Sequence, residues 1–440
     1  MNWEQLLSTK RLGLEHYHKP GSHSRTEFQR DYDRIIFSSS FRRLQNKTQV
    51  FPLPGRIFVH NRLTHSLEVA SVGRSLGNEV WQRINEDRDV NIPDLSGIIS
   101  AACLVHDLGN PPFGHSGEKV ISAFFKEHPD ASFKKEFTPA EWNDLTNFEG
   151  NANAFRLLTH QFEGKRNGGF VMTYATLAAT VKYPYNSSVN PNKKYGFFQS
   201  EKETYDKIAK DLGIVELDSE KGIYARHPLV YLVEAADDIC YQIMDIEDAH
   251  KLGILTTEQT FELFFAFFDA DGQEHFKKTL ERVGDKNEQV SYLRASVIGA
   301  LVQACAALFV RNESAILNGS YQGSLIKNMN NSIGDAYRNC SKVAVRQIYS
   351  SPEVVEIEIA GYKILNTLME VFVDAVRHPD RFYSKQLLSR VPAQFAVKGV
   401  SPYEMMQGVI DFVSGMTDVY ALDLYRKITG ISIPGVDISN

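Results

Sequence analysis

The chain has 440 residues, of which 43% are hydrophobic, 23% charged and 11% aromatic, a composition typical of a globular rather than a disordered protein. Its 48 Lys and Arg against 54 Asp and Glu give a net charge of −6, which excludes a whole-molecule attraction to nucleic acid or anionic membranes. The 4 cysteines show no CxxC spacing, and no signal-peptide core or uncharged membrane-length apolar run occurs. We therefore expect reduced cysteines, no membrane partner and a cytoplasmic location.

Helical patterns dominate the chain. Apolar residues spaced by three and four predict an amphipathic helix over residues 26–46 and a long helix over residues 61–86. Residues 97–108 are apolar nearly all round, which predicts a buried helix. Three further helices are predicted over residues 117–128, 139–160 and 172–182.

The next segment breaks this pattern. Residues 183–226 are rich in turn formers and charges, which predicts a surface excursion with a short hairpin near KGIYAR, residues 221–226. Helical pattern resumes at residue 228 and continues with interruptions to residue 429, and the Asn-, Ser- and Gly-rich segment 311–340 is the best boundary within it. The sequence predicts an all-α protein with minor β structure.

One dipeptide stands out in the most apolar predicted helix. His106 and Asp107 lie at its end, where burying an imidazole beside a carboxylate is costly unless both groups are satisfied. A divalent metal ion would satisfy both, and a plain buried His–Asp hydrogen bond is the alternative. His65 is a second candidate ligand, because it lies on a helix whose Leu63 and Leu67 are expected to face the core.

A polar stripe follows the apolar helix predicted from residue 228 onward. Asp237, Tyr241 and Asp245 are spaced by four, so they lie on one side of that helix, and Asp238 is rotated away. A solvated face is the ordinary explanation of such a stripe. Here no Lys or Arg partner lies within the helix before its end, which favours a cation site.

The order of a histidine, a His-Asp pair and a distant Asp is similar to that of HD-domain metal phosphohydrolases. The chain also contains further segments that resemble the bacterial deoxyguanosine triphosphate triphosphohydrolases over nearly its whole length. These segments are RDYDRIIFSSSFRRLQNKTQVF, HNRLTHSLEVA, HDLGNPPFGHSGE, NFEGNANAFR, TVKYPY, EAADDICYQIMDIEDA, GYKIL and SGMTD.

The resemblance implies an HD-domain helical core with an additional C-terminal helical lobe. We expect an N-terminal helical arm over residues 1–54, the catalytic core over 55–260 and a C-terminal helical region over 261–440. It also implies a homo-oligomer, commonly a hexamer.

The resemblance further implies one divalent metal ion per subunit, held by His65, His106, Asp107 and Asp237. These ligand types suit Mn²⁺ or Mg²⁺, with Fe, Co or Ni as substitutes on isolation. Such an ion lowers the pKa of a water and polarises a phosphoryl oxygen. The implied reaction is hydrolysis of dGTP, and of other dNTPs, at the α-phosphate to give the deoxynucleoside and tripolyphosphate.

Two positions depart from part of the family. Asn110 and Gly150 stand where some relatives carry further histidines, which argues for a mononuclear centre. The departure at Gly150 leaves the role of the neighbouring Glu149 open.

A proton relay is expected from His115 and Glu118, which are three residues apart at a helix start. The carboxylate can then orient the imidazole. A helix cap is the alternative role for His115, unless Ser116 caps the helix and leaves His115 facing the metal.

The remaining expected site residues would bind the substrate. By resemblance, Arg62 and Lys182 contact the triphosphate, although most such side chains are solvated surface residues. Tyr241 and Asp245 form the deoxyribose wall, with the ring excluding a 2′-hydroxyl and the carboxylate accepting from the 3′-hydroxyl. Gln49 is placed by the same resemblance at the 3′-hydroxyl, or else is an exposed glutamine.

Other functions stay open. One alternative is an HD-type phosphodiesterase or nucleotidase that acts on other nucleotides. Another is a regulatory protein that binds nucleotides or single-stranded DNA. Single-stranded DNA as a regulator would use the basic run of Arg25, Arg30, Arg34, Arg42 and Arg43. Ion pairing of these arginines with nearby carboxylates is the explanation that we favour.

Overall fold

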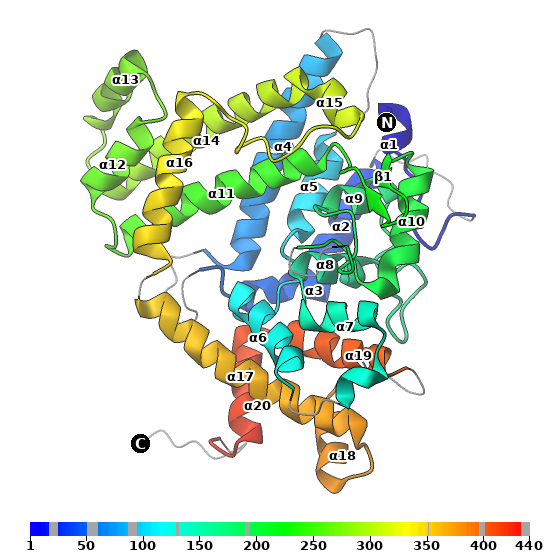
Figure 1. The fold of residues 1–440 in the computed structure, drawn as a ribbon. Helices are drawn as coiled ribbons and strands as arrows, with labels where there is room; N and C mark the ends of the chain where they lie inside the picture. Colours follow the sequence, from blue (N-terminus) through cyan, green and yellow to red (C-terminus); the bar gives the residue numbers. More distant parts are fainter. Residues whose placement is uncertain are drawn as a thin grey trace.

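The fold was obtained as a computed structural model. It describes residues 1–16, 25–50, 60–86, 95–128, 132–189, 194–350, 352–395 and 401–432 (Figure 1). Over these residues the chain forms twenty α-helices and one antiparallel pair of strands, β1 (Glu216–Asp218) and β2 (Ile223–Tyr224). The predicted all-α class with minor β structure is confirmed, as is the hairpin near KGIYAR.

Three helices form the centre of the molecule: α4 (Arg62–Glu86), α5 (Ser96–Val105) and α11 (Val230–Lys251). The apolar side chains of α5 are buried on all sides, as its composition predicts. Gly73 lets α4 approach α5 closely, because a Cβ atom there would lie 2.5 Å from the Cys103 sulfur. The sequence thus places three helix backbones close enough for their polar side chains to converge.

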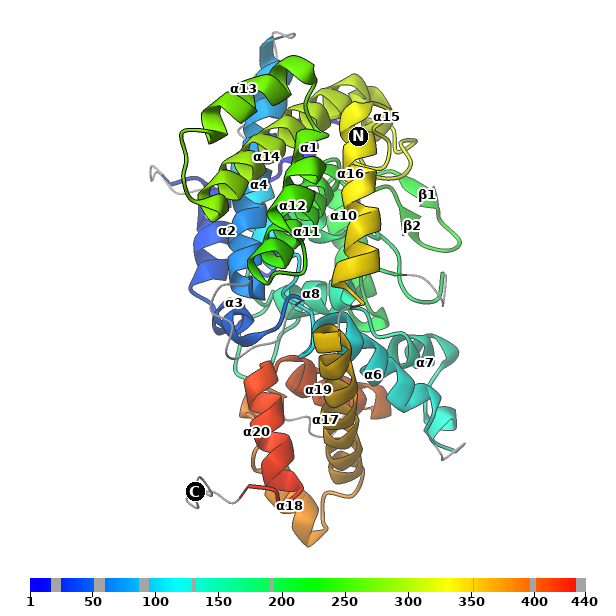
Figure 2. The ribbon, with the colours of Figure 1, turned by 90° about the vertical axis from the view of Figure 1, so that its left-hand side faces the viewer.

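An upper lobe surrounds these helices with one large hydrophobic core (Figures 1 and 2). All four cysteines are buried and free, in agreement with the sequence. The other elements of this lobe are α1 (Trp3–Leu6), α2 (Glu27–Ile36), α3 (Ser39–Arg43), α8 (Gly150–Thr159), α9 (Tyr174–Thr180), α10 (Lys202–Asp211), α12 (Thr257–Phe265), α13 (Ala270–Leu280), α14 (Lys286–Arg311), α15 (Glu313–Leu317) and α16 (Ser332–Val343).

By length and composition alone, α14 is the one helix in the described ranges that is apolar enough to cross a membrane. It packs against α4 and α11. A core helix passes the same test, so α14 is weak evidence for a membrane span.

A lower lobe has its own hydrophobic core, to which α6 from the first half of the chain and the C-terminal helices both contribute (Figure 1). The boundaries expected at residues 54 and 260, between the N-terminal arm, the catalytic core and the C-terminal region, remain predictions. The elements of this lobe are α6 (Gly114–Lys126), α7 (Pro139–Thr146), α17 (Pro352–Arg377), α18 (Phe382–Leu388), α19 (Pro402–Ser414) and α20 (Asp418–Ile428).

Buried charges join the two lobes. Arg156 on α8 donates to Asp411 on α19 at 2.8 Å and to Glu201 at 2.7 Å, and all three side chains are almost fully buried. Lys47 donates to the carbonyl oxygens of Asn110 and Ser414. The C-terminal lobe is therefore fixed to the segment that follows α5.

Some predicted boundaries are wrong. The helix predicted over residues 26–46 breaks after Ile36, because the Ser38 hydroxyl caps a new helix, α3. The helix predicted over 139–160 breaks at Asn147, and Glu149 caps α8. Ser116 does not cap α6, which begins at Gly114 after Phe113 in the left-handed conformation with φ 62°.

The segment 183–226 is only partly a surface excursion. It contains the helix α10, and its Tyr195, Phe197 and Tyr205 side chains are fully buried. The helix α10 contains charged residues between its buried apolar ones. Its composition therefore predicts an exposed segment and not a helix with one buried face.

The interlobe charges predict the effect of one substitution. Asp411→Ala should lower the free energy of unfolding by about 3–5 kcal/mol, because it leaves the buried Arg156 guanidinium short of a partner. Asp374→Ala is the matched control, since its pair with Arg381 is more than half exposed and should be worth less than about 1 kcal/mol. Urea unfolding followed by circular dichroism measures both, and equal effects would contradict the assigned role of Asp411.

A histidine at the start of α4 predicts a pH dependence. His60 lies 2.8 Å from Asp248 and 3.0 Å from Glu68. Burial disfavours its charge, but these carboxylates outweigh burial and raise the pKa of His60 to about 10. The stabilisation is fully present below the unfolded pKa of about 6.5 and is lost as pH rises through about 10.

We therefore expect His60→Gln to lower the urea midpoint most at pH 6 and progressively less at pH 8 and 9.5. The control is His378→Gln, an exposed histidine on α17. A difference between wild type and His60→Gln that stays constant over this range would contradict the assignment.

Candidate metal centre

The three central helices bring His65, His106 and Asp237 together. His65 comes from α4, His106 directly follows α5, and Asp237 comes from α11. Asp237 Oδ1 lies 3.2 Å from His65 Nε2 and 3.4 Å from His106 Nε2. One ligand atom from each residue lies within 4.8 Å of the other two, a spacing that suits a single metal ion.

The donor set fits a divalent ion. His106 Nδ1 donates to the Cys103 carbonyl oxygen at 2.7 Å, which leaves the Nε2 lone pair directed at Asp237. This Nε2 atom is buried without a well-aligned hydrogen bond, as expected of a metal ligand. A plain His–Asp hydrogen bond would not leave that atom unsatisfied.

Asp107 lies at the edge of this cluster. Its Oδ2 atom is 3.6 Å from His106 Nε2 and also accepts from the Arg62 guanidinium, and its Oδ1 atom accepts from Asn110. Burial alone would raise the pKa of Asp107, but Arg62, His106 and His65 hold it well below its usual range. The carboxylate is thus ionised, and Arg62 serves here as its partner.

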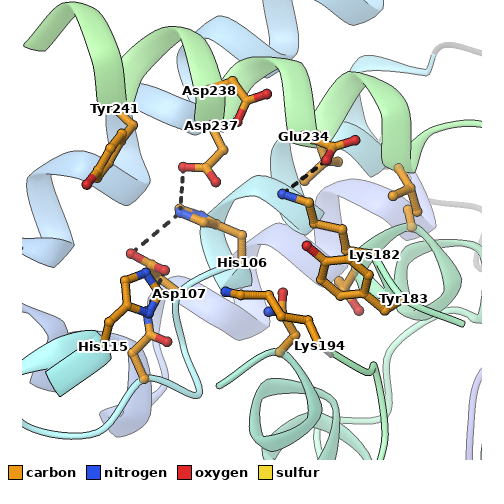
Figure 3. A pocket seen from close by; sticks show the side chains of 16 residues that line it. His106, Asp107, His115, Lys182, Tyr183, Lys194, Glu234, Asp237, Asp238 and Tyr241 are labelled. Atoms are coloured by element: carbon orange, nitrogen blue, oxygen red, sulfur yellow. Dashed lines mark hydrogen bonds and ion pairs between the residues drawn. The ribbon is translucent and has the colours of Figure 1, made fainter. Parts of the chain in front are cut away.

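The cluster opens into a cavity of about 210 Å³ (Figure 3). The Asp237 carboxylate is directed toward His106. The neighbouring Asp238 also lines the cavity, but its carboxylate is directed away from His106. Six of the predicted site residues line this cavity: His106, Asp107, His115, Lys182, Asp237 and Tyr241. The other five predicted residues are His65, Glu118, Gln49, Arg62 and Asp245, none of which is among its lining residues.

His115 and Glu118 form the predicted pair. His115 Nδ1 lies 2.8 Å from Glu118 Oε2, and the imidazole is 62% exposed at the cavity. The second oxygen of Glu118 accepts from the Gly150 backbone N–H at 2.8 Å. A Cβ atom at Gly150 would lie 2.6 Å from Glu118 Oε1 and 2.2 Å from Asn110, so only glycine lets the carboxylate approach this backbone.

Two lysines approach the cavity from the side opposite Tyr241 (Figure 3). Lys182 lies 3.2 Å from Glu234, and although burial opposes its charge, Glu234 and other anionic groups raise the pKa of Lys182. Lys194 lies 3.8 Å from Glu149. The sequence analysis missed Lys194, because it lies in an irregular segment without periodicity.

Further lining residues were also missed. Asn151, Thr180, Tyr183 and Glu234 line the cavity, and Asp238 does so although it was expected to be rotated away. All five lie inside the quoted motifs NFEGNANAFR, TVKYPY and EAADDICYQIMDIEDA, and this position is the one signal that could have identified them.

Two of the predicted sugar-binding residues, Tyr241 and Asp245, both lie next to Tyr349. Asp245 is buried and accepts from the Tyr349 hydroxyl at 2.6 Å, and the Tyr241 and Tyr349 rings lie 5.8 Å apart. Burial raises the pKa of Asp245 to about 7, although the Tyr349 hydroxyl opposes the shift. Gln49 is not fully exposed, and its buried Oε1 atom has no hydrogen-bond partner in the described part of the chain.

Comparison with known proteins defines the class. Residues 62–186 match the HD domain, and residues 328–427 match the phosphohydrolase-associated domain. The first match contains His65, His106 and Asp107. The fold, the cluster and these matches make the chain an HD-type, metal-dependent phosphohydrolase.

The similar proteins define the family. A deoxyguanosinetriphosphate triphosphohydrolase-like protein of Pseudomonas aeruginosa is 37% identical over 99% of this chain and 100% of its own length. A protein of the same description from Synechocystis is 37% identical over 98% of this chain and all of its own length. The deoxyguanosinetriphosphate triphosphohydrolase of Yersinia enterocolitica is 30% identical over 91% of this chain and 93% of its own length. The chain belongs to the deoxyguanosinetriphosphate triphosphohydrolase-like family.

The cluster geometry predicts metal binding by one of two adjacent carboxylates. Asp237→Asn should weaken Mn²⁺ affinity by more than about 100-fold, because even residues that only orient a ligand change affinity about 10- to 100-fold. Asp238→Asn is the matched control and should retain the ion. Metal content after dialysis, measured by mass spectrometry, separates the two, and equal losses would place the site elsewhere.

Proposed function

We propose that the chain hydrolyses dGTP, and more weakly other dNTPs, to the deoxynucleoside and tripolyphosphate. The observation that supports this most is the convergence of the His65–His106–Asp237 cluster, the His115–Glu118 pair and two lysines on one cavity. The names of the similar proteins support the same substrate class.

We propose His65, His106, Asp107 and Asp237 as the ligands of one Mn²⁺ or Mg²⁺ ion. When bound, the ion supplies an activated water and charge stabilisation at the phosphoryl oxygens. Cytoplasmic location and assembly into a homo-oligomer are parts of the same proposal. Exposed Ile359 and Tyr362 on α17 and Phe382 on α18 offer apolar surface for such an assembly.

The side chains of the cavity then divide the work. His115 moves a proton at the scissile phosphate, and Glu118 fixes the imidazole through Nδ1 and leaves Nε2 directed at the substrate. Lys182 and Lys194 bind the phosphate chain. Tyr241 packs against the sugar. Asp245, Gln49 and Arg62 do not line the cavity, so they act indirectly, through the residues that do.

The test follows the products and the oxygen of water. With dGTP, Mn²⁺ and ¹⁸O-water, we expect tripolyphosphate carrying ¹⁸O and unlabelled deoxyguanosine, because water attack on the α-phosphate breaks its bond to the 5′-oxygen. His115→Ala should lower kcat by about 10²- to 10⁴-fold without loss of bound metal. Release of orthophosphate or pyrophosphate, or label in the nucleoside, would contradict the proposal and favour a different phosphohydrolase activity.

A further inference from the structure

A second cavity, of about 420 Å³, lies apart from the candidate metal centre and shares no lining residue with it. We call it the arginine pocket. It is lined by α3 and the end of α2, by the loop that follows α8, and by residues next to Phe395. Five of its lining residues are basic: Arg34, Arg42, Arg43, Lys165 and Arg166.

Among the described residues, no Asp or Glu lines the arginine pocket. The ion pairing expected for the basic run holds for Arg25 with Asp33 and for Arg30 with Glu27. It is wrong for the three arginines of the pocket, which have no ion pair within the described ranges. The reason is that Arg11, fully buried, takes Glu27 and Asp31.

The pocket arginines are held by neutral acceptors instead. Arg34 donates to the Phe170 carbonyl oxygen at 3.0 Å, Arg42 to the Phe37 carbonyl oxygen at 2.7 Å and Arg43 to the Ser40 hydroxyl at 3.1 Å. These bonds orient the guanidinium groups without neutralising them. Burial and the charges of Arg11 and Arg166 lower the pKa of Arg34, and together they outweigh the opposing effect of Asp31 and Glu27.

The walls add shape to this charge. Ser38, Ser39 and Ser40 line the pocket with hydroxyl groups, and the Phe37 ring beside them is 73% exposed. The volume is that of a site for a small molecule of nucleotide size. The planar guanidinium group can donate two parallel hydrogen bonds to the oxygens of a phosphate or carboxylate group.

We propose that the arginine pocket binds the phosphate chain of a small polyphosphate anion. Inorganic tripolyphosphate and a nucleoside triphosphate share this chemistry. The proposal does not rest on the proposed hydrolysis, because its test measures binding in the presence of EDTA.

The test is calorimetric titration of the full chain with sodium tripolyphosphate. We expect binding that weakens with salt, and at least about tenfold weaker binding to Arg42→Gln/Arg166→Gln, because this variant removes two charged hydrogen-bond donors from the pocket. Both side chains are exposed, so this variant should fold, as circular dichroism will check. The control Arg25→Gln/Arg381→Gln removes the same charge from exposed arginines outside the pocket and should bind within twofold of wild type.

A third variant separates the two cavities. Lys182→Gln/Lys194→Gln changes only the cavity at the metal centre. This variant should bind tripolyphosphate at the arginine pocket with the affinity of the wild type. If the lysine variant loses binding and the arginine variant does not, the anion binds at the metal centre and the proposal is wrong. The absence of binding to wild type at millimolar tripolyphosphate would also overturn it.

Two further ligands identify the source of the phosphate chain. A higher affinity for dGTP than for tripolyphosphate, lost in Phe37→Ala, would support a nucleoside triphosphate with its base on Phe37. Equal affinities would support the inorganic chain. If a 15-residue oligothymidylate binds in an arginine-dependent manner and neither small anion binds, the site is for single-stranded DNA and the proposal is wrong.

Discussion

The fold depends on placing two imidazoles and a carboxylate at the point where α4, α5 and α11 meet. The two imidazoles lose most of their hydration there, whereas the Asp237 side chain stays 29% exposed. Apolar helix faces lie behind the cluster, and charged side chains line the cavity in front of it. The buried, unsatisfied Nε2 of His106 shows that protein hydrogen bonds alone do not satisfy the cluster. The helix packing therefore favours a state in which a cation completes the site, and metal binding is linked to the stability of the central helices.

The turn after the ligands is held by the C-terminal lobe. Phe113 has a left-handed conformation, a type of strain that costs about 1–3 kcal/mol and persists only when its surroundings fix it. Its backbone N–H donates to Asp418 Oδ1 at 3.1 Å, and the other oxygen of Asp418 accepts from the Thr48 backbone at 2.8 Å. The Asp418 carboxylate, in the SGMTD segment, thus fixes the start of α6, which carries His115. It also fixes the segment next to Gln49.

The sequence was informative wherever chemistry and helical periodicity coincide. The identity of α4 and α5, the position of His106 at a helix end and the choice of Asp237 over Asp238 all follow from spacing and composition. The break at Ser38 was not predictable in this way, because three consecutive serines offer equal caps and apolar spacing continues through them. Lys194 and the buried ring of Tyr205 were missed because tertiary packing, rather than local pattern, places them.

The partners of Asp107 and of the arginines show the same limit. Arg62 was expected to contact a phosphate chain, and in the folded chain it donates to the Asp107 carboxylate, 45 residues away in sequence. Arg11 lies outside the basic run and still affects its ion pairing, because it pairs with Glu27 and Asp31. Ion pairing is a property of the folded chain, and a count of nearby charges does not determine it.

The two cavities differ in the charge of the side chains that line them. The cavity at the metal centre is lined by four carboxylates and two lysines, and the lysines already lie near Glu234 and Glu149. A phosphate chain would meet net negative charge there, and a divalent ion held by the cluster would reduce that charge. The described lining of the arginine pocket has five basic side chains and no carboxylate, so the proposed anion would need no metal there. Removal of divalent ions would then leave phosphate binding only at the arginine pocket, which makes the two sites separable in one protein.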